Sequence, residues 1–420
     1  MKTYGKNRYI AFTLRILLWS HRMMMWISTR LGLKRKNVGE EGYDILLTGT
    51  FHSANWILTH LKPLSLAQHC RRVRVVTDFP IPPLDKVEVV YPAAWLVRIV
   101  GRVLARLLTF AAVAIHSRPH VVGGFHLLLN GLTVSLLGRI CGARSIYFCV
   151  GGPAEVLGGG ILSENRIFER LREPDLRIES MLLRAAAGFD LIITMGTGAR
   201  DFLRERGITG EIQIVSGGID SGRFGPINDL PTWDVVFVGR LVPIKRIDIL
   251  LRALKVVKEE IDQVKAVIVG DGPLRQELEV LARDLGLKDA VDFTGHCADI
   301  PSILNRSKVF VLTSQTEGLS LALMEAMMSG LPAVVSDVGD LHDLIMNGTN
   351  GFLVEDHTPE IFAERIAALL RDPNLRGKFA RAARAAMESR ETSCVVRQWD
   401  AILSLWRNGD VLRTNEQCAE

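Results

Sequence analysis

Along most of the chain, short runs of consecutive apolar residues alternate with longer segments in which apolar residues recur every three or four positions. The runs are typical of buried parallel strands, and the longer segments are typical of helices that cover them. Because strands that alternate with helices fold into mostly parallel sheets, the pattern predicts α/β domains of the doubly wound, Rossmann type. The predicted strands cover residues 43–49, 72–78, 87–91, 120–124, 144–150 and 190–196, and then 233–239, 265–272, 290–295, 309–314 and 332–337.

A stretch rich in Gly, Pro and Asp, VSGGIDSGRFGPINDLPTW, separates the two series of strands and is typical of an interdomain linker. The length of 420 residues also favours more than one domain. The predicted organisation is a basic amphipathic extension (1–39), a first Rossmann-like domain (40–218), a second Rossmann-like domain (219–390) and a C-terminal helix with a tail (391–420).

Charge is distributed unevenly. The first 39 residues contain nine Lys or Arg and no acidic residue, which leaves −4 on the rest of a chain whose net charge is +5. Arg8, Arg15 and Arg22 share one stripe of a predicted helix whose other positions are largely apolar, with two tryptophans. Because Arg15 interrupts the apolar run, neither a secretory signal nor a spanning helix is expected. Such a helix suits the surface of an anionic membrane, or it packs on its own protein with its arginines in water.

A second segment has a similar pattern. Arg98, Arg102 and Arg106 recur every fourth residue and are predicted to line one edge of an otherwise apolar helix within residues 93–119. A half-buried helix with a charged rim and a membrane-docking helix both fit this pattern. With both basic helices docked, residues 1–36 and 93–119 would place the protein on the inner, cytoplasmic face of an anionic cell membrane.

Composition narrows the class of protein. Hydrophobic residues make up 48% of the chain and charged residues 23%, which excludes intrinsic disorder. The six cysteines are scattered, without a CxxC pair or a metal-ligand spacing. This indicates a reducing compartment and argues against a disulfide framework and a zinc site. The charge pattern does not call for a nucleic-acid partner.

Candidate ligand-binding residues follow the strands of the second domain, because ligands of such sheets bind beyond the carboxyl ends of the strands. Arg240 and Lys245 come after the first of these strands, and a planar guanidinium beside an ammonium group suits a ligand with more than one phosphate. Gly239 and His296 also stand at strand ends and are predicted to contribute to the same nucleotide site.

The segment TEGLSLALMEAMMSGLPAVVSD places Glu317 before a predicted helix and Glu325 within it. Gly318 frees the backbone at the helix start, where the amides of Leu319 and Ser320 can donate to a phosphate with help from the helix dipole. Carboxylates accept hydrogen bonds from hydroxyls instead, so the two glutamates are expected to reach two polyol parts of one ligand. A phosphate between two polyols is a nucleotide sugar. The alternative is an ordinary amphipathic helix with acidic decoration.

These motifs resemble a known family. The segments VGRLVPIK, VGDGP, FTGH and EGLSLALMEAMMSGLPAVVSDVG…NGTNGFLV, in that order and spacing, are similar to the donor half of the retaining nucleotide-sugar glycosyltransferases of family 4. The resemblance is specific over about residues 185–370 and weaker over 43–184. It implies the GT-B fold, in which an acceptor domain and a donor domain face each other across a cleft. It also implies that the C-terminal helix, VVRQWDAILSLW, crosses back to the first domain.

The resemblance implies a role for each matching residue. Arg240 and Lys245 would hold the diphosphate and stabilise the departing nucleotide, Glu317 would contact the donor sugar, and Glu325 would bind the ribose hydroxyls. The chain also departs from the family pattern. Lys-Arg replaces Lys-Gly at residue 246, Gly-Gly replaces Asn-Gly in VSGGID, and GDLHDLI replaces Gly-Gly-x-x-Glu, so an unusual sugar-reading end is expected.

In the first domain, many relatives carry a histidine at a strand end opposite the sugar, but the matching loop YFCVGGPAEVLGGG has none. His126, after the preceding strand, is the best substitute as a catalytic residue, although a lone histidine there is commonly structural. Gly49, His52 and Asn55 occupy the first strand-to-helix turn, where relatives approach the donor phosphate and the acceptor. Gly49 is assigned to the donor side, and His52 and Asn55 to the acceptor side.

The expected reaction is transfer of a glycosyl group, with retention of configuration, from a nucleotide diphosphate sugar to a hydroxyl. UDP is the default donor nucleotide, and GDP-mannose stays open as an alternative donor. No Asp-x-Asp stands where a metal-dependent transferase needs one, so cations and a helix terminus are expected to replace a metal, and no cofactor is predicted. The basic helices favour a lipid-linked saccharide or glycolipid of surface polysaccharide synthesis as acceptor. A soluble acceptor, a nucleotide-sugar epimerase of the same fold and an inactive membrane-bound scaffold are the alternatives.

Overall fold

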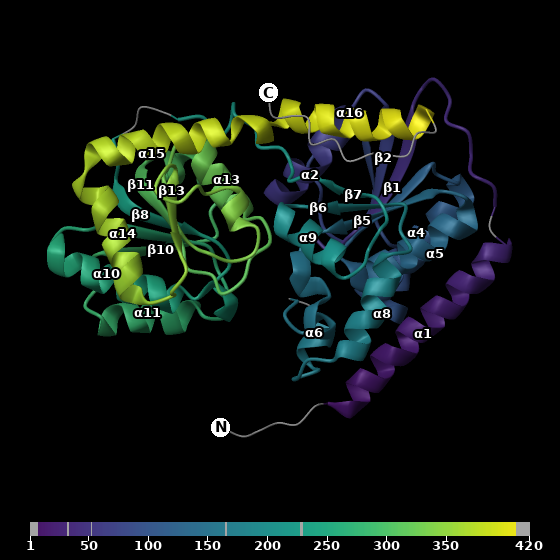
Figure 1. The fold of residues 1–420 in the computed structure, drawn as a ribbon, viewed down its shortest axis with the longest axis horizontal. Helices are drawn as coiled ribbons and strands as arrows, with labels where there is room; N and C mark the ends of the chain where they lie inside the picture. Colours follow the sequence, from purple (N-terminus) through teal and green to yellow (C-terminus); the bar gives the residue numbers. More distant parts are fainter. Residues whose placement is uncertain (1–6, 32, 52, 164–165, 227–229, 409–420) are drawn as a thin grey trace. The chain divides into compact units, whose positions relative to one another are not determined.

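The computed structural model describes residues 7–31, 33–51, 53–163, 166–226 and 230–408 of the chain. The chain divides into two compact units. Unit 1 contains residues 1–218 and 393–420, and unit 2 contains residues 219–392. Each unit has a parallel sheet with helices packed against it (Figure 1). The predicted fold class, α/β with two Rossmann-like domains, is therefore confirmed.

In unit 1, the strands pair in the order β3-β2-β1-β4-β5-β6-β7, and every pairing is parallel. The order changes direction between β1 and β4, and sheets of this type bind ligands at the carboxyl ends of the two strands at such a change. The strands are β1 (Tyr43–Thr48), β2 (Cys70–Val76), β3 (Val87–Val90), β4 (Val121–Phe125), β5 (Arg144–Cys149), β6 (Leu191–Thr194) and β7 (Ile212–Ile214). The longer helices are α1 (Arg8–Leu31), α2 (Ala54–Leu66), α3 (Ala94–Val100), α4 (Arg102–Ser117), α5 (Leu132–Cys141), α8 (Leu176–Ala186), α9 (Thr197–Glu205) and α16 (Thr392–Asn408).

Unit 2 repeats the same plan, with strand order β10-β9-β8-β11-β12-β13 and parallel pairing throughout. Here the order changes direction between β8 and β11. The strands are β8 (Trp233–Val238), β9 (Ala266–Val269), β10 (Val291–Gly295), β11 (Ser307–Leu312), β12 (Ala333–Ser336) and β13 (Gly351–Val354). The longer helices are α10 (Ile247–Glu260), α11 (Arg275–Asp284), α12 (Ile300–Asn305), α13 (Leu321–Met328), α14 (Pro359–Arg371) and α15 (Pro373–Ala386).

Two strands, β7 and β13, were absent from the sequence prediction. Both are outermost strands of their sheets. A strand at an edge has one neighbour and part of its surface in water, so it lacks the continuous apolar run of a central strand. β7 has the sequence Ile-Gln-Ile, and β13 begins with a glycine. Their pairing partners, rather than their own residues, make them strands.

Helix α1 forms an outer layer of unit 1, packed on α5 and α8 (Figure 1). Ala11, Leu14 and Leu18 enter the hydrophobic core, and Arg15 forms an ion pair of 2.6 Å with the buried Asp175. This face fits the interpretation of a helix packed on its own protein, except that Arg15 is paired with Asp175 instead of lying in water. The opposite face exposes large apolar side chains, namely Tyr9, Phe12, Ile16, Trp19, Met23, Met24, Trp26 and Ile27.

The helix predicted within residues 93–119 is wrong in two respects. Gly101 has φ 79° and ψ 164°, so the chain forms two helices, α3 and α4, rather than one. Arg106 does not line a charged rim with Arg98 and Arg102, because its side chain is buried. A four-residue spacing cannot distinguish an arginine in water from one that meets buried hydrogen-bond partners. Among the residues that the structure describes, no helix has both the length and the apolar character needed to cross a membrane.

The C-terminal helix α16 packs on unit 1, as predicted (Figure 1). The Asp400 carboxylate accepts a hydrogen bond from the backbone N–H of His69, and Trp406 packs edge-on against Tyr43. His69 and Tyr43 lie just before β2 and at the start of β1. The helix therefore contacts the amino ends of these strands and leaves their carboxyl ends to the candidate site.

Candidate functional site

The change in strand order of unit 2 places two loops side by side. Lys245 ends a short 3-10 turn after β8, and Glu317 lies in the loop after β11. Since β8 and β11 are parallel neighbours, both loops begin at the carboxyl end of the sheet. This edge is where ligands of doubly wound sheets bind.

Lys245 and Glu317 form an ion pair at this edge. The ammonium nitrogen lies 2.5 Å from Oε1 of Glu317, and the two side chains are 16% and 10% exposed. The hydroxyl of Ser314 donates a second hydrogen bond to the same oxygen, at 2.6 Å. A half-buried pair of this kind is held in one geometry, so both charges are preorganised for a ligand that has anionic and hydroxyl groups.

Backbone contacts hold the Lys245 loop against the end of β11. The Thr313 hydroxyl bonds to the carbonyls of Lys245 and Arg246, at 3.1 Å and 2.9 Å, and the N–H of Gln315 donates to the carbonyl of Ile244 at 2.8 Å. The position of the Lys245 ammonium group is therefore set by a strand that begins about 60 residues later in the chain.

Gly339, after β12, presses against the same region. Its φ is +58°, and a Cβ atom placed on it would lie 1.8 Å from the carbonyl oxygen of Glu317. No other residue fits this position without moving Glu317. The sequence motif that ends in Gly339 thus contributes to the site through its lack of a side chain.

The two arginines of this region have different surroundings. Arg240 follows β8 and is exposed at the same edge. Arg246, which replaces the glycine of the family pattern, has φ +46° and makes a bidentate ion pair with Asp248, with both N–O distances 3.0 Å. A left-handed backbone favours glycine, which is the residue of the family pattern at this position. Asp248 therefore neutralises the additional positive charge of Arg246.

Helix α13 begins at Leu321, and the hydroxyl of Ser320 caps it by accepting from the N–H of Leu323. Gly318 and Leu319 lie before the helix and are half-buried. Glu325 lies inside the helix and is only 3% exposed, whereas Glu317 precedes it. The two acids of the motif therefore lie on different elements, Glu317 in the loop before α13 and Glu325 within the helix.

The remaining predicted residues of unit 2 lie further apart. Gly239 directly follows β8. His296 follows β10, the edge strand, and is exposed. Because β9 separates β10 from β8, His296 is roughly 10 Å along the sheet from the strand that carries Arg240 and Lys245. Of the predicted set, Lys245 and Glu317 are brought into direct contact and His296 is peripheral to them.

In unit 1, Gly49 follows β1 and packs closely on Phe125, with a Cβ position 3.0 Å from that side chain. Asn55 lies in the first turn of α2 and is half-buried. His52 lies outside the described residues. Gly49 and His126 follow β1 and β4, the two strands at which the order of this sheet changes direction.

His126 contacts a residue that sequence reasoning missed. Its Nδ1 lies 3.1 Å from Oε1 of Glu155, a carboxylate that is 5% exposed and comes from the loop after β5. The same carboxylate accepts from the backbone N–H groups of Gly151 and Leu127 and from the hydroxyl of Tyr147, at 2.7, 2.8 and 2.9 Å. Glu155 is the acid in the quoted segment YFCVGGPAEVLGGG, and a single charge in a loop of apolar and glycine residues was the available signal.

Burial raises the pKa of Glu155, but the positive charge that His126 carries when protonated, its hydrogen bond, and the amides of Gly151 and Leu127 outweigh it. The carboxyl therefore has a pKa below its ordinary value and is ionised in the folded protein. By contrast, desolvation and the neighbouring charges raise the pKa of Tyr147, which keeps its hydroxyl as a donor.

A second buried cluster lies at the carboxyl end of the unit 1 sheet. The guanidinium of Arg106 donates to Asp78, Thr50 and Asn130, each at 3.0 Å. Thr50 and Asp78 belong to the loops after β1 and β2, and Asn130 follows β4. One side chain from α4 therefore ties together the three loops at this end of the sheet.

The sequence is similar to those of known glycosyltransferases. Residues 223–386 match the family described as glycosyl transferases group 1. A GDP-mannose-dependent alpha-(1-6)-phosphatidylinositol monomannoside mannosyltransferase of Mycobacterium tuberculosis is 28% identical over 56% of this chain and 65% of its own length. A UDP-Gal:alpha-D-GlcNAc-diphosphoundecaprenol alpha-1,3-galactosyltransferase of Escherichia coli is 34% identical over 39% of this chain and 46% of its own. The chain thus matches only about half to two thirds of the length of these relatives.

Solved structures extend the similarity to both units. The sucrose-phosphate synthase of Thermosynechococcus elongatus has a TM-score of 0.71 at 17% identity, over 88% of this chain and 100% of its own. The Anabaena protein HepE in complex with UDP-glucose has a TM-score of 0.65 at 20% identity, over 86% and 99%. At these identities the likeness shows the fold. Residues 223–386 are therefore similar to group 1 glycosyl transferases, and each unit has the Rossmann-like fold found in these GT-B structures.

Proposed function

We propose that this protein is a retaining, metal-independent glycosyltransferase that moves a sugar from a nucleotide diphosphate sugar to the hydroxyl of a lipid-linked saccharide or glycolipid. The observation that carries the proposal is the ion pair of Lys245 and Glu317 at the change in strand order of unit 2. A nucleotide sugar offers phosphate oxygens to an ammonium group and hydroxyls to a carboxylate, and the pair presents both groups at one point.

The chemistry follows from these charges. As the bond from the anomeric carbon to the diphosphate breaks, negative charge develops on the leaving oxygen. Lys245 and Arg240 stabilise that charge, which is the role a metal ion has in other transferases. The acceptor hydroxyl attacks from the face that the diphosphate leaves and gives its proton to the departing phosphate oxygen, so the configuration of the anomeric carbon is retained. Glu317 holds the sugar through a hydroxyl, and Glu325 binds the ribose.

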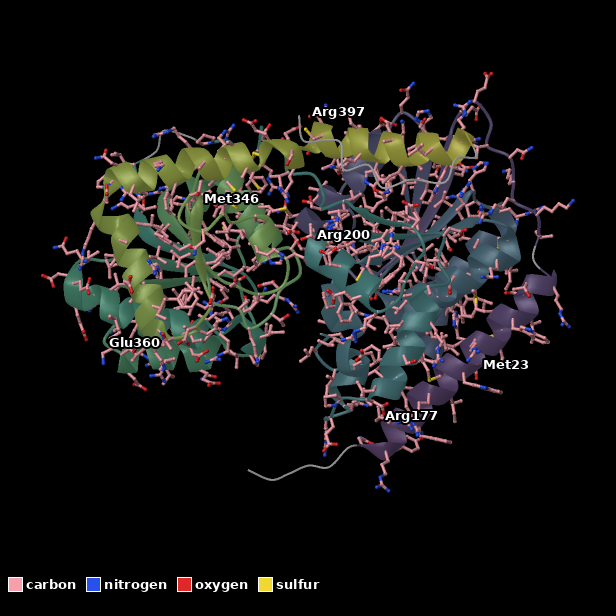
Figure 2. The ribbon with its side chains drawn as sticks, in the orientation of Figure 1. Met23, Arg177, Arg200, Met346, Glu360 and Arg397 are labelled. Atoms are coloured by element: carbon pink, nitrogen blue, oxygen red, sulfur yellow. The ribbon has the colours of Figure 1, made fainter. Side chains whose placement is uncertain are left out.

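The proposed acceptor rests on the outer face of α1. Trp19 is 59% exposed, Trp26 is 54% exposed, and Figure 2 shows Met23 on the side of α1 away from α5 and α8. Arg22 adds positive charge to this face. Exposed aromatic residues with cations suit the interface of an anionic membrane, where an enzyme of this family meets a lipid-linked substrate. Trp95 and Ile99 on α3 are also exposed.

The decisive experiment is a donor and product assay on the purified full chain. UDP-glucose, UDP-galactose, UDP-N-acetylglucosamine and GDP-mannose are screened by thermal shift, because selective binding to the folded state raises the melting temperature. The stabilising donor is then incubated with N-acetylglucosaminyl-diphosphoundecaprenol or phosphatidylinositol monomannoside in vesicles. Transfer that survives EDTA, with the donor's anomeric configuration kept in the product, is expected. An inverted product would refute retention, and conversion of the donor without an acceptor would identify an epimerase.

A further inference from the structure

We propose that Glu155 is a positioning residue for His126: it fixes the imidazole as the Nδ1–H tautomer, so that Nε2 carries the lone pair used toward substrate. This inference rests on the proposed function, because a substrate hydroxyl is the partner that we assign to Nε2. His126 is the group that touches substrate, and Glu155 acts through it.

The tautomer follows from the hydrogen-bond inventory of the carboxylate. An ionised carboxylate can only accept hydrogen bonds, so each of its four partners must donate. The partners are Nδ1 of His126, the amides of Gly151 and Leu127, and the hydroxyl of Tyr147. Nδ1 therefore carries a hydrogen, and in the neutral imidazole Nε2 is the acceptor. The His126 side chain is 43% exposed, whereas Glu155 is almost fully buried, so the ring offers its outer part to a ligand.

The backbone gives a second, independent observation. His126 has φ +67° and Leu129 has φ +63°, a left-handed region that is costly for residues other than glycine. Glu155 holds this strained segment at two points, the ring of His126 and the N–H of Leu127. Strain of this kind persists only where surrounding contacts determine it, and it is concentrated at functional sites.

The pair also joins two neighbouring strand ends. β4 and β5 are paired up to Phe125 and Phe148, and the N–H of His126 continues that pairing to the Phe148 carbonyl. His126 leaves β4, and Glu155 follows β5. The acid thus fixes the histidine at the strand next to the change in strand order of unit 1. From β5 and the segment that follows it, Glu155 contacts the ring, and the Tyr147 hydroxyl donates to the Glu155 carboxylate.

A double-mutant cycle tests the inference with the donor and acceptor that support transfer. Glu155→Gln is expected to lower kcat roughly 100-fold and to leave KM for the donor within about 3-fold, because the amide cannot accept all four bonds. His126→Gln is expected to do the same. The double variant is expected to be no slower than His126→Gln, since both changes remove one effect. Losses that multiply would overturn the proposal.

The matched control is Glu179→Gln. Glu179 is another acid of unit 1 that is 5% exposed, and it holds the neighbouring loop by accepting from the N–H of Gly158 at 2.7 Å. The variant makes the same chemical change at a similar burial without a contact to His126. We expect kcat within about 3-fold of wild type. If Glu179→Gln lowers kcat as much as Glu155→Gln does, the effect of Glu155 would be explained by stability alone, and the inference would fail.

A measurement without turnover separates this inference from the proposed function. Nitrogen NMR of protein labelled at histidine, with the His126 signals identified by their absence in His126→Gln, reports which ring nitrogen carries the hydrogen. We expect Nδ1–H in wild type and a shift toward Nε2–H in Glu155→Gln. If no donor supports transfer, the proposed function falls while this tautomer result still supports the positioning of His126. If transfer occurs but the tautomer is Nε2–H in wild type, the inference falls and the proposed function stands.

Discussion

The ammonium nitrogen of Lys245 and the carboxylate of Glu317 lie 2.5 Å apart, although 72 residues separate them in the sequence. The contact crosses the one place in the unit 2 sheet where the strand order changes direction. It keeps an ammonium and a carboxylate ready at the point where a doubly wound sheet binds its ligand. In the proposed complex with a nucleotide sugar, Lys245 would contact the phosphate and Glu317 would contact a hydroxyl of the sugar.

Replacing Lys245 by alanine is expected to lower kcat/KM for transfer by roughly 30- to 1000-fold, or about 2 to 4 kcal/mol, because the leaving diphosphate loses a preorganised cation. Steady-state kinetics with the stabilising donor measure the loss. Lys255→Ala removes an exposed lysine from α10 and is expected to act as wild type. Equal rates for Lys245→Ala and wild type would remove Lys245 from the phosphate site.

Gly339→Ala is expected to lower donor affinity strongly, because the new Cβ would overlap the Glu317 carbonyl oxygen at 1.8 Å and move that residue. Gly348→Ala is the matched control. Gly348 also has a positive φ, +75°, but it has nothing within 4 Å of its Cβ position, so it bears only the conformational cost of about 1 kcal/mol. Isothermal titration with donor should show weakened binding for the first variant only. Comparable binding by both would argue against steric control of Glu317.

Arg106→Ala is expected to lower the free energy of unfolding of unit 1 by about 3 to 5 kcal/mol, because it leaves buried hydrogen-bond partners of the guanidinium unpaired. Arg106→Lys should restore little, since an ammonium group lacks the planar fork that reaches three partners. Urea denaturation followed by circular dichroism measures both. Arg102→Ala, at an exposed position one turn earlier, should change the free energy by less than about 0.5 kcal/mol. A small loss in Arg106→Ala would show that the cluster is dispensable for folding.

Stability is expected to fall on acidification, with His60 as one identifiable cause. Desolvation lowers the pKa of His60 to about 4, from an ordinary 6.5. Between these values the unfolded chain binds a proton that the folded protein does not. The free energy of unfolding therefore rises with pH from about 4 to 6.5, by up to about 3 kcal/mol for this group.

His60→Gln should reduce that slope, and it should leave the smaller contributions of His21 and His120, whose pKa values burial also lowers. Urea unfolding at several pH values between 4.5 and 7 gives the slopes. His116→Gln, at an exposed position, provides the control and should keep the wild-type slope. An unchanged slope in His60→Gln would refute this assignment.

Membrane binding is expected to depend on the outer face of α1. Replacing both Trp19 and Trp26 by serine should lower the partition of the protein onto vesicles containing phosphatidylglycerol by at least about 10-fold, because each buried tryptophan contributes on the order of 2 kcal/mol. The control replaces Leu230 and Met346 of unit 2 by serine; these are 90% and 60% exposed (Met346 in Figure 2). Vesicle flotation at low and high salt measures both. Equal recovery on neutral and anionic vesicles would contradict electrostatic docking.

The sequence by itself determined the two parallel sheets and the residues at their strand ends. Central strands are buried on both faces, so they appear as apolar runs, and the residues that end them are identified without knowledge of pairing. The motif around Glu317 and the cations Arg240 and Lys245 followed from this. So did the basic and apolar surface of α1, because a helix with a period of 3.6 displays its faces in its own sequence.

Only the tertiary structure decided which of those residues meet. Strand order is a property of pairing across the sheet, so the contact of Lys245 with Glu317 and the distance of His296 from it could not be obtained from spacing. The burial of Arg106 and the hydrogen bonds of Glu155 depend on partners from loops far apart in the chain. The sequence does not show whether a charged side chain is exposed or buried, because the same side chain can be solvated at a surface or paired in a core.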